Sequence, residues 1–197
     1  MVHPRGAMEV LYEQNFDAND EYPPYWAELW PSSIALARAV AAAAPVGARG
    51  LELGCGLGLP SIAAALCGAH VLATDRSTDA LTFTTYNAAL NGTSVEVDVC
   101  SWADAESVVS RAPWDLVLGA DVLYPHADLT DLAELLPRLV TAGGEVWLAD
   151  PGRPPAAAFV ASCTRWAESS GGHQDDAGVT VHRLRALDRR AEERKRR

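Results

Sequence analysis

A chain of 197 residues has the length of a single domain and is long enough to bury one substantial core. Apolar residues make up 49% and charged residues 21%, as in ordinary globular proteins, and the formal net charge is −10. The segment 188–197 contributes +3, so the other 187 residues carry −13. Such a surface repels phosphate backbones, which argues against duplex DNA or RNA as a partner and favours a cationic one.

The remaining totals exclude several classes of protein. We interpret segment 188–197 as a solvated, disordered tail, with a nucleic-acid-binding arm as the alternative. No two of the four cysteines have CxxC spacing, so neither a metal site nor a disulfide framework is predicted. The most apolar stretch, 34–46, is too short to span a bilayer, and the N-terminus lacks a signal pattern. We therefore expect a reduced, cytoplasmic protein.

In chain order, residues 1–22 form a polar arm without periodicity. Ser32 or Ser33 then caps a first helix behind Pro31, and this helix ends at 45–47. Strands and helices alternate from that point. Strands are predicted at 50–53, 70–74, 95–99, 115–119 and 145–149. Helices are predicted up to 67, at 77–90, up to 110 as a short polar helix, at 129–140 and at 156–168.

The end of the chain departs from this alternation. Residues 173–187 read as two strands around Ala177-Gly178, with no helix between them. Strands that alternate with helices predict a parallel sheet with helices on both faces, and the hairpin makes one edge strand antiparallel. We therefore predict an α/β fold of the Rossmann-like, doubly wound kind. It has a mostly parallel seven-stranded sheet, an antiparallel C-terminal edge hairpin and one domain over 23–187.

The sharpest motif is a glycine-rich loop between the first predicted strand and its helix. It contains Gly54, which makes the tight turn, Gly56, which lets a ligand approach the backbone, and Gly58, which permits close packing at the helix start. Free backbone N–H groups there favour an anionic ligand group. Asp75 follows Gly54 by 21 residues at the end of the second strand, where its carboxylate can accept hydrogen bonds from both ribose hydroxyls.

Three features favour S-adenosylmethionine over NAD as the ligand of this loop. The spacing is GxGxG preceded by Glu52, rather than GxGxxG. About fifty residues precede the first strand, and 197 residues leave no room for a separate substrate domain. The carboxylate of the amino-acid part of S-adenosylmethionine is then the anionic group at the loop.

Polar and aromatic residues also follow the third, fourth and fifth predicted strands, at the edge of the sheet where ligands of open α/β folds bind. They are Cys100, Ser101 and Trp102; Ala120, Asp121, Leu123 and Tyr124; and Asp150, Pro151, Gly152 and Arg153. The spacing of Asp121 and Tyr124 allows both to face one pocket. Each of these residues also has a structural alternative.

Those alternatives are specific. Trp102 contacts an adenine or is a core aromatic, and Asp121 faces the pocket or caps the following helix. His126 is a base or a solvated loop residue. Asp150 and Arg153 contact a substrate or pair with each other and brace their loop. His70 begins a strand behind the crevice and is interpreted as structural.

From about residue 22 to 187, the chain resembles the seven-β-strand methyltransferases, and among them the small protein-lysine methyltransferases of the electron-transfer-flavoprotein β-subunit type. The loop 52–58 is specific only for the class. The segments 24–31 (PYWAELWP), 115–124 (DLVLGADVLY) and 150–154 (DPGRP), with Asn87, carry the closer resemblance. The resemblance implies that Trp30 lies against the cofactor and that Asp121 and Tyr124 form the acceptor site. The implied cofactor-binding residues are Trp30, Glu52, Gly54, Gly56, Gly58, Asp75, Ser101, Trp102 and Ala120.

The predicted reaction is methyl transfer to a lysine of a protein. A lysine must attack unprotonated, although its usual pKa is ~10.4, and a neighbouring carboxylate favours the charged form. Asp121 is therefore interpreted as an orienting group rather than as a strong base. Because the chain is short, a small amine remains open as the acceptor. A non-catalytic cofactor-binding module is the third reading.

Overall fold

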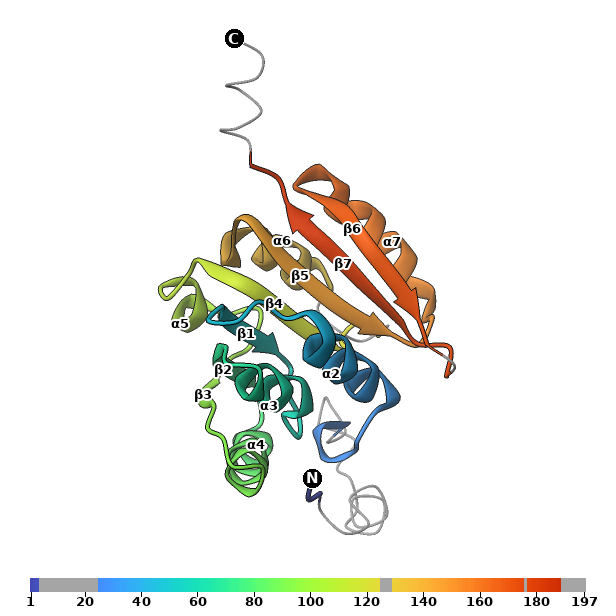
Figure 1. Cartoon of the computed structure of the whole chain (residues 1–197). Helices are drawn as coiled ribbons and strands as arrows, with labels where there is room; N and C mark the ends of the chain where they lie inside the picture. Colours follow the sequence, from blue (N-terminus) through green and yellow to red (C-terminus); the bar gives the residue numbers. More distant parts are fainter. Residues whose placement is uncertain (4–24, 125–128, 176, 189–197) are drawn as a thin grey trace, which may run out of the picture.

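The computed structural model describes residues 1–3, 25–124, 129–175 and 177–188. Seven strands form one mixed sheet in the order β3-β2-β1-β4-β5-β7-β6 (Figure 1). The strands are β1 (Arg49–Leu53), β2 (His70–Asp75), β3 (Glu96–Val99), β4 (Trp114–Ala120), β5 (Val140–Asp150), β6 (Ala167–Gln174) and β7 (Thr180–Ala186). The helices are η1 (Tyr25–Ala27), α2 (Pro31–Ala43), α3 (Leu59–Leu66), α4 (Thr78–Leu90), α5 (Glu106–Val109), α6 (Leu129–Leu139), α7 (Pro154–Ser162) and η2 (Cys163–Arg165). The predicted α/β architecture is confirmed.

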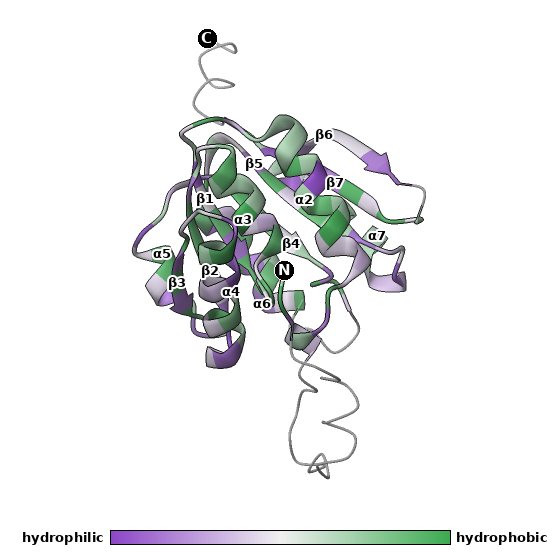
Figure 2. Cartoon of the chain, turned by 60° about the horizontal axis from the view of Figure 1, so that its bottom comes forward, coloured by the Kyte–Doolittle hydropathy of each residue, from purple (hydrophilic) through white to green (hydrophobic). Residues whose placement is uncertain are grey.

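Alternate residues of the central strands bury into two separate apolar clusters, one on each face of the sheet. In β4, Leu116 and Leu118 pack with Leu36 of α2 and Ala64 of α3, whereas Val117 points to the opposite face. A strand that is covered on both faces reads as a continuous apolar run, which explains the sequence of β4. In the hydropathy view, α2 and α3, whose buried residues pack on this sheet, are drawn mostly in green, the colour of hydrophobic residues (Figure 2).

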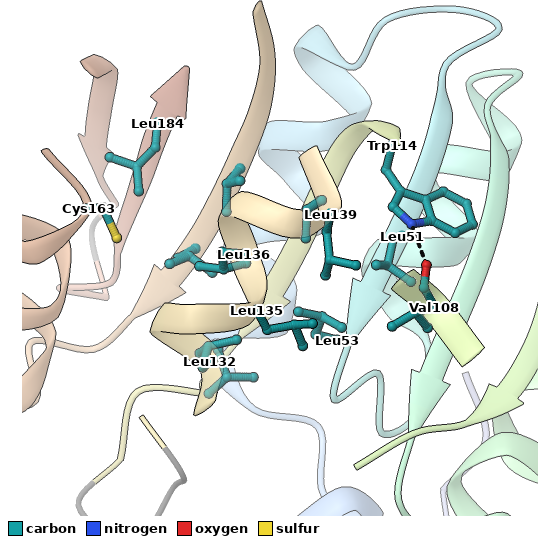
Figure 3. Packing of buried hydrophobic residues seen from close by; sticks show 14 of the residues in the cluster. Leu51, Leu53, Val108, Trp114, Leu132, Leu135, Leu136, Leu139, Cys163 and Leu184 are labelled. Atoms are coloured by element: carbon teal, nitrogen blue, oxygen red, sulfur yellow. Dashed lines mark hydrogen bonds between the residues drawn. The ribbon is translucent and has the colours of Figure 1, made fainter. Parts of the chain in front are cut away.

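Helix α6 supplies most of the core on the second face. Its apolar residues recur at helical spacing and are fully or almost fully buried: Leu132, Leu135, Leu136 and Leu139. They pack near Leu51 and Leu53 of β1 (Figure 3). On the far side of this cluster, the indole N–H of Trp114 donates to the carbonyl of Val108, 3.3 Å away. Burying these side chains fixes the register in which β1, β4 and α6 meet.

The C-terminal hairpin is real, but its strands lie differently from the prediction. β7 pairs antiparallel with both β5 and β6, so the antiparallel strand lies inside the sheet and β6 forms the edge. β6 also begins at Ala167, in a segment predicted as the end of a helix. That helix, α7, ends at Ser162. The predicted antiparallel C-terminal edge hairpin is therefore confirmed; its first strand, β6, forms the edge and its second strand, β7, pairs with β5.

Two other boundaries differ. β5 already begins at Val140 and runs through Gly143-Gly144, which were predicted to lie between a helix and a strand. α2 begins at Pro31 behind Trp30, and the hydroxyl of the buried Ser32 makes a long-range contact instead of a cap. The helix start is thus set by proline, whose missing N–H costs nothing in the first turn. No helix in the described part of the chain is long and apolar enough to cross a membrane.

The strand order places the functional edge. From β1 the chain moves outward to β2 and β3, and then returns to β4 and β5 on the other side of β1. Loops after β1 and β4 therefore diverge at the carboxyl ends of two neighbouring parallel strands. This switch point is where open α/β sheets bind their ligands.

Candidate functional site

The glycine loop after β1 is held in a conformation that other residues resist. Gly56 and Gly58 have φ of 53° and 80°, the left-handed region. A Cβ on Gly58 would lie 2.6 Å from the Thr84 side chain of α4, so the expected close packing at the helix start is confirmed. A Cβ on Gly56 would lie 3.1 Å from the carbonyl oxygen of Trp26, so the chain's own backbone approaches Gly56 closely.

That approach comes from η1, which covers the loop. The ring of Trp26 packs against Phe83 of α4 with centroids 5.6 Å apart. η1 thereby spans the gap between the glycine loop and α4. Sequence reasoning did not single out Trp26, although it lies inside the segment 24–31.

Glu52 lies beneath the loop and is almost completely buried. Its Oε2 accepts hydrogen bonds from the backbone N–H of Ser61, at 2.9 Å, and from the Ser61 hydroxyl. Ser61 belongs to the first turn of α3, where N–H groups lack helical partners, so Glu52 ties that turn to β1. Burial raises the pKa of Glu52 to about 8, against the lowering effect of the Ser61 hydrogen bonds. Direct contact of Glu52 with a cofactor stays a prediction.

Asp75 closes the loop from the end of β2. One carboxylate oxygen accepts the N–H of Gly56 at 3.0 Å, and the other accepts the N–H of Ser77 at 2.9 Å. Burial raises its pKa, while these backbone hydrogen bonds lower it. A carboxylate oxygen can accept two hydrogen bonds, so each still has one acceptor position for a hydroxyl.

The segment after β3 forms a tight turn in which Ser101 bridges to Asp104. Ser101 is exposed. Trp102 is half-buried and packs against the apolar cluster that contains Leu51, which favours its core role. Ala120, at the end of β4, is half-buried against the opposite cluster. A role for any of these three in cofactor binding stays a prediction.

Asp121 has the most unusual surroundings of the predicted residues. It has φ of 57°, a strained conformation for a residue other than glycine, and its backbone N–H is bound to the carbonyl of Ala149 at 2.9 Å. Its Oδ1 accepts from Nε of Arg153 at 2.9 Å and from a terminal guanidinium nitrogen of the same residue. Its Oδ2 accepts from the hydroxyl of Ser32 at 3.2 Å. Because residues 122–124 after it are not helical, and its side-chain oxygens bind Arg153 and Ser32, the alternative of a helix cap was wrong.

Three aromatic side chains form a cluster that includes Tyr124, from the segment that follows Asp121. The ring of Tyr25 meets Tyr124 edge-on, with centroids 6.1 Å apart, and meets Trp30 in the same way at 6.1 Å. The indole N–H of Trp30 donates to the carbonyl of Tyr25 at 2.8 Å. η1 thus brings the predicted residues Trp30 and Tyr124 to one cluster. Tyr25 was missed as a site residue, and its place in the segment 24–31 was the only available signal.

The loop after β5 corrects one alternative. The side chains of Asp150 and Arg153 do not pair with each other. Instead, Oδ1 of Asp150 accepts the N–H groups of Gly152 and Arg153, both at 2.7 Å, and so braces the loop. The guanidinium of Arg153 reaches Asp121. Oδ2 of Asp150 is buried without a hydrogen-bond partner in the described structure.

Three predicted residues lie away from this arrangement or outside it. His70 is exposed at the amino end of β2, far from the strand's functional end, in agreement with its structural interpretation. The buried Asn87 of α4 holds the carbonyl of Leu57 at 3.2 Å and both backbone groups of Val2. His126 lies outside the described residues. Within the described ranges, no three His, Cys, Asp or Glu side chains are grouped so that they could hold a metal ion.

Comparison with known proteins fits this geometry. Residues 25–158 match the model of a family described as lysine methyltransferase. The chain belongs to this family. It is 37% identical over 137 residues to the electron transfer flavoprotein beta subunit lysine methyltransferase of Xenopus laevis, a match that covers 66% of this chain and 53% of that protein. It is also 38% identical over 98 residues to the protein N-lysine methyltransferase METTL21A of Danio rerio, which covers 47% and 44%.

This member of the lysine methyltransferase family spans about half the length of the curated relatives that it matches. Its fold is similar to that of the N-methyltransferase NodS from Bradyrhizobium japonicum, solved in complex with S-adenosyl-L-homocysteine. The TM-score is 0.66 at 17% identity, and the match covers 86% of this chain and 93% of that one. At this identity the likeness shows the fold, and the Rossmann-like prediction is confirmed.

Proposed function

We propose that this protein transfers a methyl group from S-adenosylmethionine to a lysine side chain of a protein. The observation that carries the proposal is the position of two carboxylates, one on each side of the switch point of a lysine-methyltransferase fold. Asp75 closes the glycine loop at the end of β2. Asp121 directly follows β4, in the segment that carries Tyr124 of the aromatic cluster, and it binds Ser32, close in sequence to Trp30 of that cluster. The first suits a cofactor and the second suits an amine.

The residues present fit the proposed cofactor. The carboxylate of Asp75 keeps acceptor capacity for a ribose hydroxyl beside the N–H groups of Gly56 and Ser77. Within the glycine loop, the N–H groups of Cys55, Gly56 and Gly58 are bound to Thr74, Asp75 and Cys55. When bound, S-adenosylmethionine supplies a methyl group that its sulfonium charge has already activated. The chain's own task is then to align the amine and to exclude water, and such positioning can be worth ~7–11 kcal/mol.

Asp121 and the aromatic cluster perform that task in our proposal. Asp121 accepts a hydrogen bond from the attacking amine and fixes its direction. Tyr25, Trp30 and Tyr124 form an apolar wall around the side chain of the acceptor lysine. The proton of the lysine leaves to solvent before attack.

We propose the β subunit of an electron-transfer flavoprotein as the first acceptor to test. The support is the 37% identity to the Xenopus laevis relative, whose name states that substrate. The net charge of −13 over residues 1–187 also suits a surface that carries lysines.

The test is an assay with methyl-labelled S-adenosylmethionine, given the purified flavoprotein β subunit or a lysate of the native organism, followed by mass spectrometry. We expect one to three methyl groups on lysines of a protein. Asp121→Ala should abolish most turnover and leave donor affinity within a few-fold. Asp115→Ala is the matched control, because Asp115 lies at the opposite end of β4 and accepts only the N–H of Arg49 among the hydrogen bonds found in the structure.

The outcomes separate the competing functions. Label found only in small metabolites indicates a small-amine methyltransferase. Donor binding without any turnover indicates a non-catalytic module. Loss of donor binding in Asp121→Ala, in step with activity, contradicts the acceptor role of Asp121, once thermal unfolding has shown that the variant is folded.

A further inference from the structure

A carboxylate beside an acceptor lysine creates a conflict. It orients the amine, but it also stabilises the protonated form, which cannot attack. A lysine with the usual pKa of ~10.4 is already almost fully protonated at neutral pH. An isolated, buried Asp121 would therefore hold the acceptor in its unreactive state.

Arg153 changes the charge of this site. Two of its guanidinium nitrogens donate to the same oxygen of Asp121, Oδ1, and the side chains are 32% and 7% exposed. Among the described residues, Oδ2 accepts a hydrogen bond only from the neutral hydroxyl of Ser32, at the longer distance of 3.2 Å. The guanidinium of Arg153 thus binds Oδ1, and Oδ2 keeps an acceptor position for another donor.

The backbone fixes both partners of this pair to one strand. The N–H of Arg153 is bound to Oδ1 of Asp150, the last residue of β5. The N–H of Asp121 is bound to the carbonyl of Ala149, also in β5. Arg153 is followed directly by α7, which begins at Pro154. The guanidinium is therefore held against Asp121 by the fold and not by chance contact of two surface side chains.

We propose that Arg153 is a positioning residue that keeps Asp121 electrically compensated, so that Oδ2 accepts a hydrogen bond from the neutral amine of the acceptor without stabilising its protonated form. The inference rests on the proposed function. The pair as a whole is neutral, so it directs the amine by geometry rather than by charge.

Two titratable groups of neighbouring strands are linked to this pair. Asp150 of β5 accepts the N–H of Arg153, and His182 of β7 interacts electrostatically with Asp150. Burial lowers the pKa of His182, against the raising effect of Asp150, and so moves its titration away from the pH range of the experiment. α2 contributes only the neutral Ser32.

The experiment is the pH profile of kcat on the flavoprotein β subunit between about pH 7 and pH 10.5. In Arg153→Gln, removal of one charge several ångströms from the amine, at an effective dielectric constant of 20–40, should raise the amine pKa by roughly one to two units. Below pH 10 this lowers kcat about 10- to 100-fold, and it moves the midpoint of the rising limb above pH 10.5. Arg153→Lys keeps the charge and should keep the midpoint. Asp121→Asn/Arg153→Gln removes both charges, so its midpoint should return to the native value on a lower plateau. Arg185→Gln, which breaks a similar arginine–carboxylate pair at the other end of the sheet, is the matched control and should leave the profile unchanged.

A second readout does not depend on turnover. The amine pKa of a 13Cε-lysine peptide that carries the modified site can be measured by NMR, with S-adenosylhomocysteine bound, and it should rise in Arg153→Gln by the same amount. If Arg153→Gln lowers kcat but leaves the NMR pKa of the amine unchanged, Arg153 is only structural and the inference is wrong. If the native protein methylates no lysine, the proposed function itself is wrong, and the inference falls with it.

Discussion

Glu52→Gln tests whether the buried carboxyl group beneath the glycine loop is kept uncharged. Its usual pKa of 4.5 is raised to about 8 in the folded protein, mainly by burial. The folded state therefore binds this proton more tightly than the unfolded state. A group with a raised pKa stabilises the fold fully below pH 4.5, and that stabilisation is lost as the pH rises through 8.

The magnitude follows from the two pKa values. Each pH unit between them lowers the free energy of unfolding by about 1.4 kcal/mol. Between pH 5 and pH 8 the native protein should lose roughly 3.5 kcal/mol through Glu52 alone. Glutamine has no proton to lose, and its amide oxygen can keep the hydrogen bonds to Ser61. Between pH 5 and pH 8, the free energy of unfolding of Glu52→Gln should therefore rise by roughly 3.5 kcal/mol relative to that of the native protein.

The assay is urea unfolding of both proteins at several pH values, with the difference in unfolding free energy plotted against pH. Glu96→Gln is the control, because the Glu96 side chain is 63% exposed in a surface ion pair with Arg111, and such pairs contribute about 0–1 kcal/mol. A difference between native and Glu52→Gln that stays constant from pH 5 to pH 8 would refute the reasoning, since Glu52 would then titrate alike in both states.

Three further results are expected. Asp75→Ala should weaken binding of S-adenosylmethionine by about 1.5–3 kcal/mol in calorimetry, the scale of hydrogen bonds to a charged group, and unchanged affinity would remove Asp75 from the cofactor site. Gly58→Ala should lower the midpoint of thermal unfolding more than Gly47→Ala does. Both glycines have a positive φ, but only at Gly58 would the new Cβ meet another side chain, that of Thr84 at 2.6 Å. Equal losses would show that the loop shifts to accommodate the methyl group. The kcat/KM for a protein acceptor should fall as the salt concentration rises, because salt screens the attraction between the acidic domain and a cationic surface, and a flat dependence would exclude electrostatic steering.

The central sheet could be predicted because burial leaves a local signal. β4 is buried on both faces, so its residues form a continuous apolar run that ends in Asp121. β6 has no such signal. Seven of its eight residues are exposed, and Ser169, Ser170, Gly171 and Gly172 have low strand propensity. This segment is a strand because β7 pairs with it, and such pairing over a distance is not visible in a local pattern.

The positions of the candidate residues at the strand ends could be predicted from the sequence, but their contacts could not. Glycines and carboxylates at strand ends mark the edge of the sheet, and Asp75 indeed closes the glycine loop. The partners of Asp121, however, lie 32 and 89 residues away, at Arg153 and Ser32. Asp150 is closer to Arg153 in sequence and was the more obvious partner. Its carboxylate, however, accepts the backbone N–H of Arg153, and the guanidinium of Arg153 binds Asp121 instead.

The insertion of β7 between β5 and β6 dictates an order of assembly. During synthesis β5 leaves the ribosome well before β7, and until residues 180–186 have emerged its outer backbone groups have no strand partner. β6 emerges in the same interval and cannot substitute, because its partner is β7. Strand edges of this kind recruit other chains. The protein is therefore most prone to aggregation before β7 has paired, and a released chain truncated just before residue 180 should display an open β5 edge that chaperones protect.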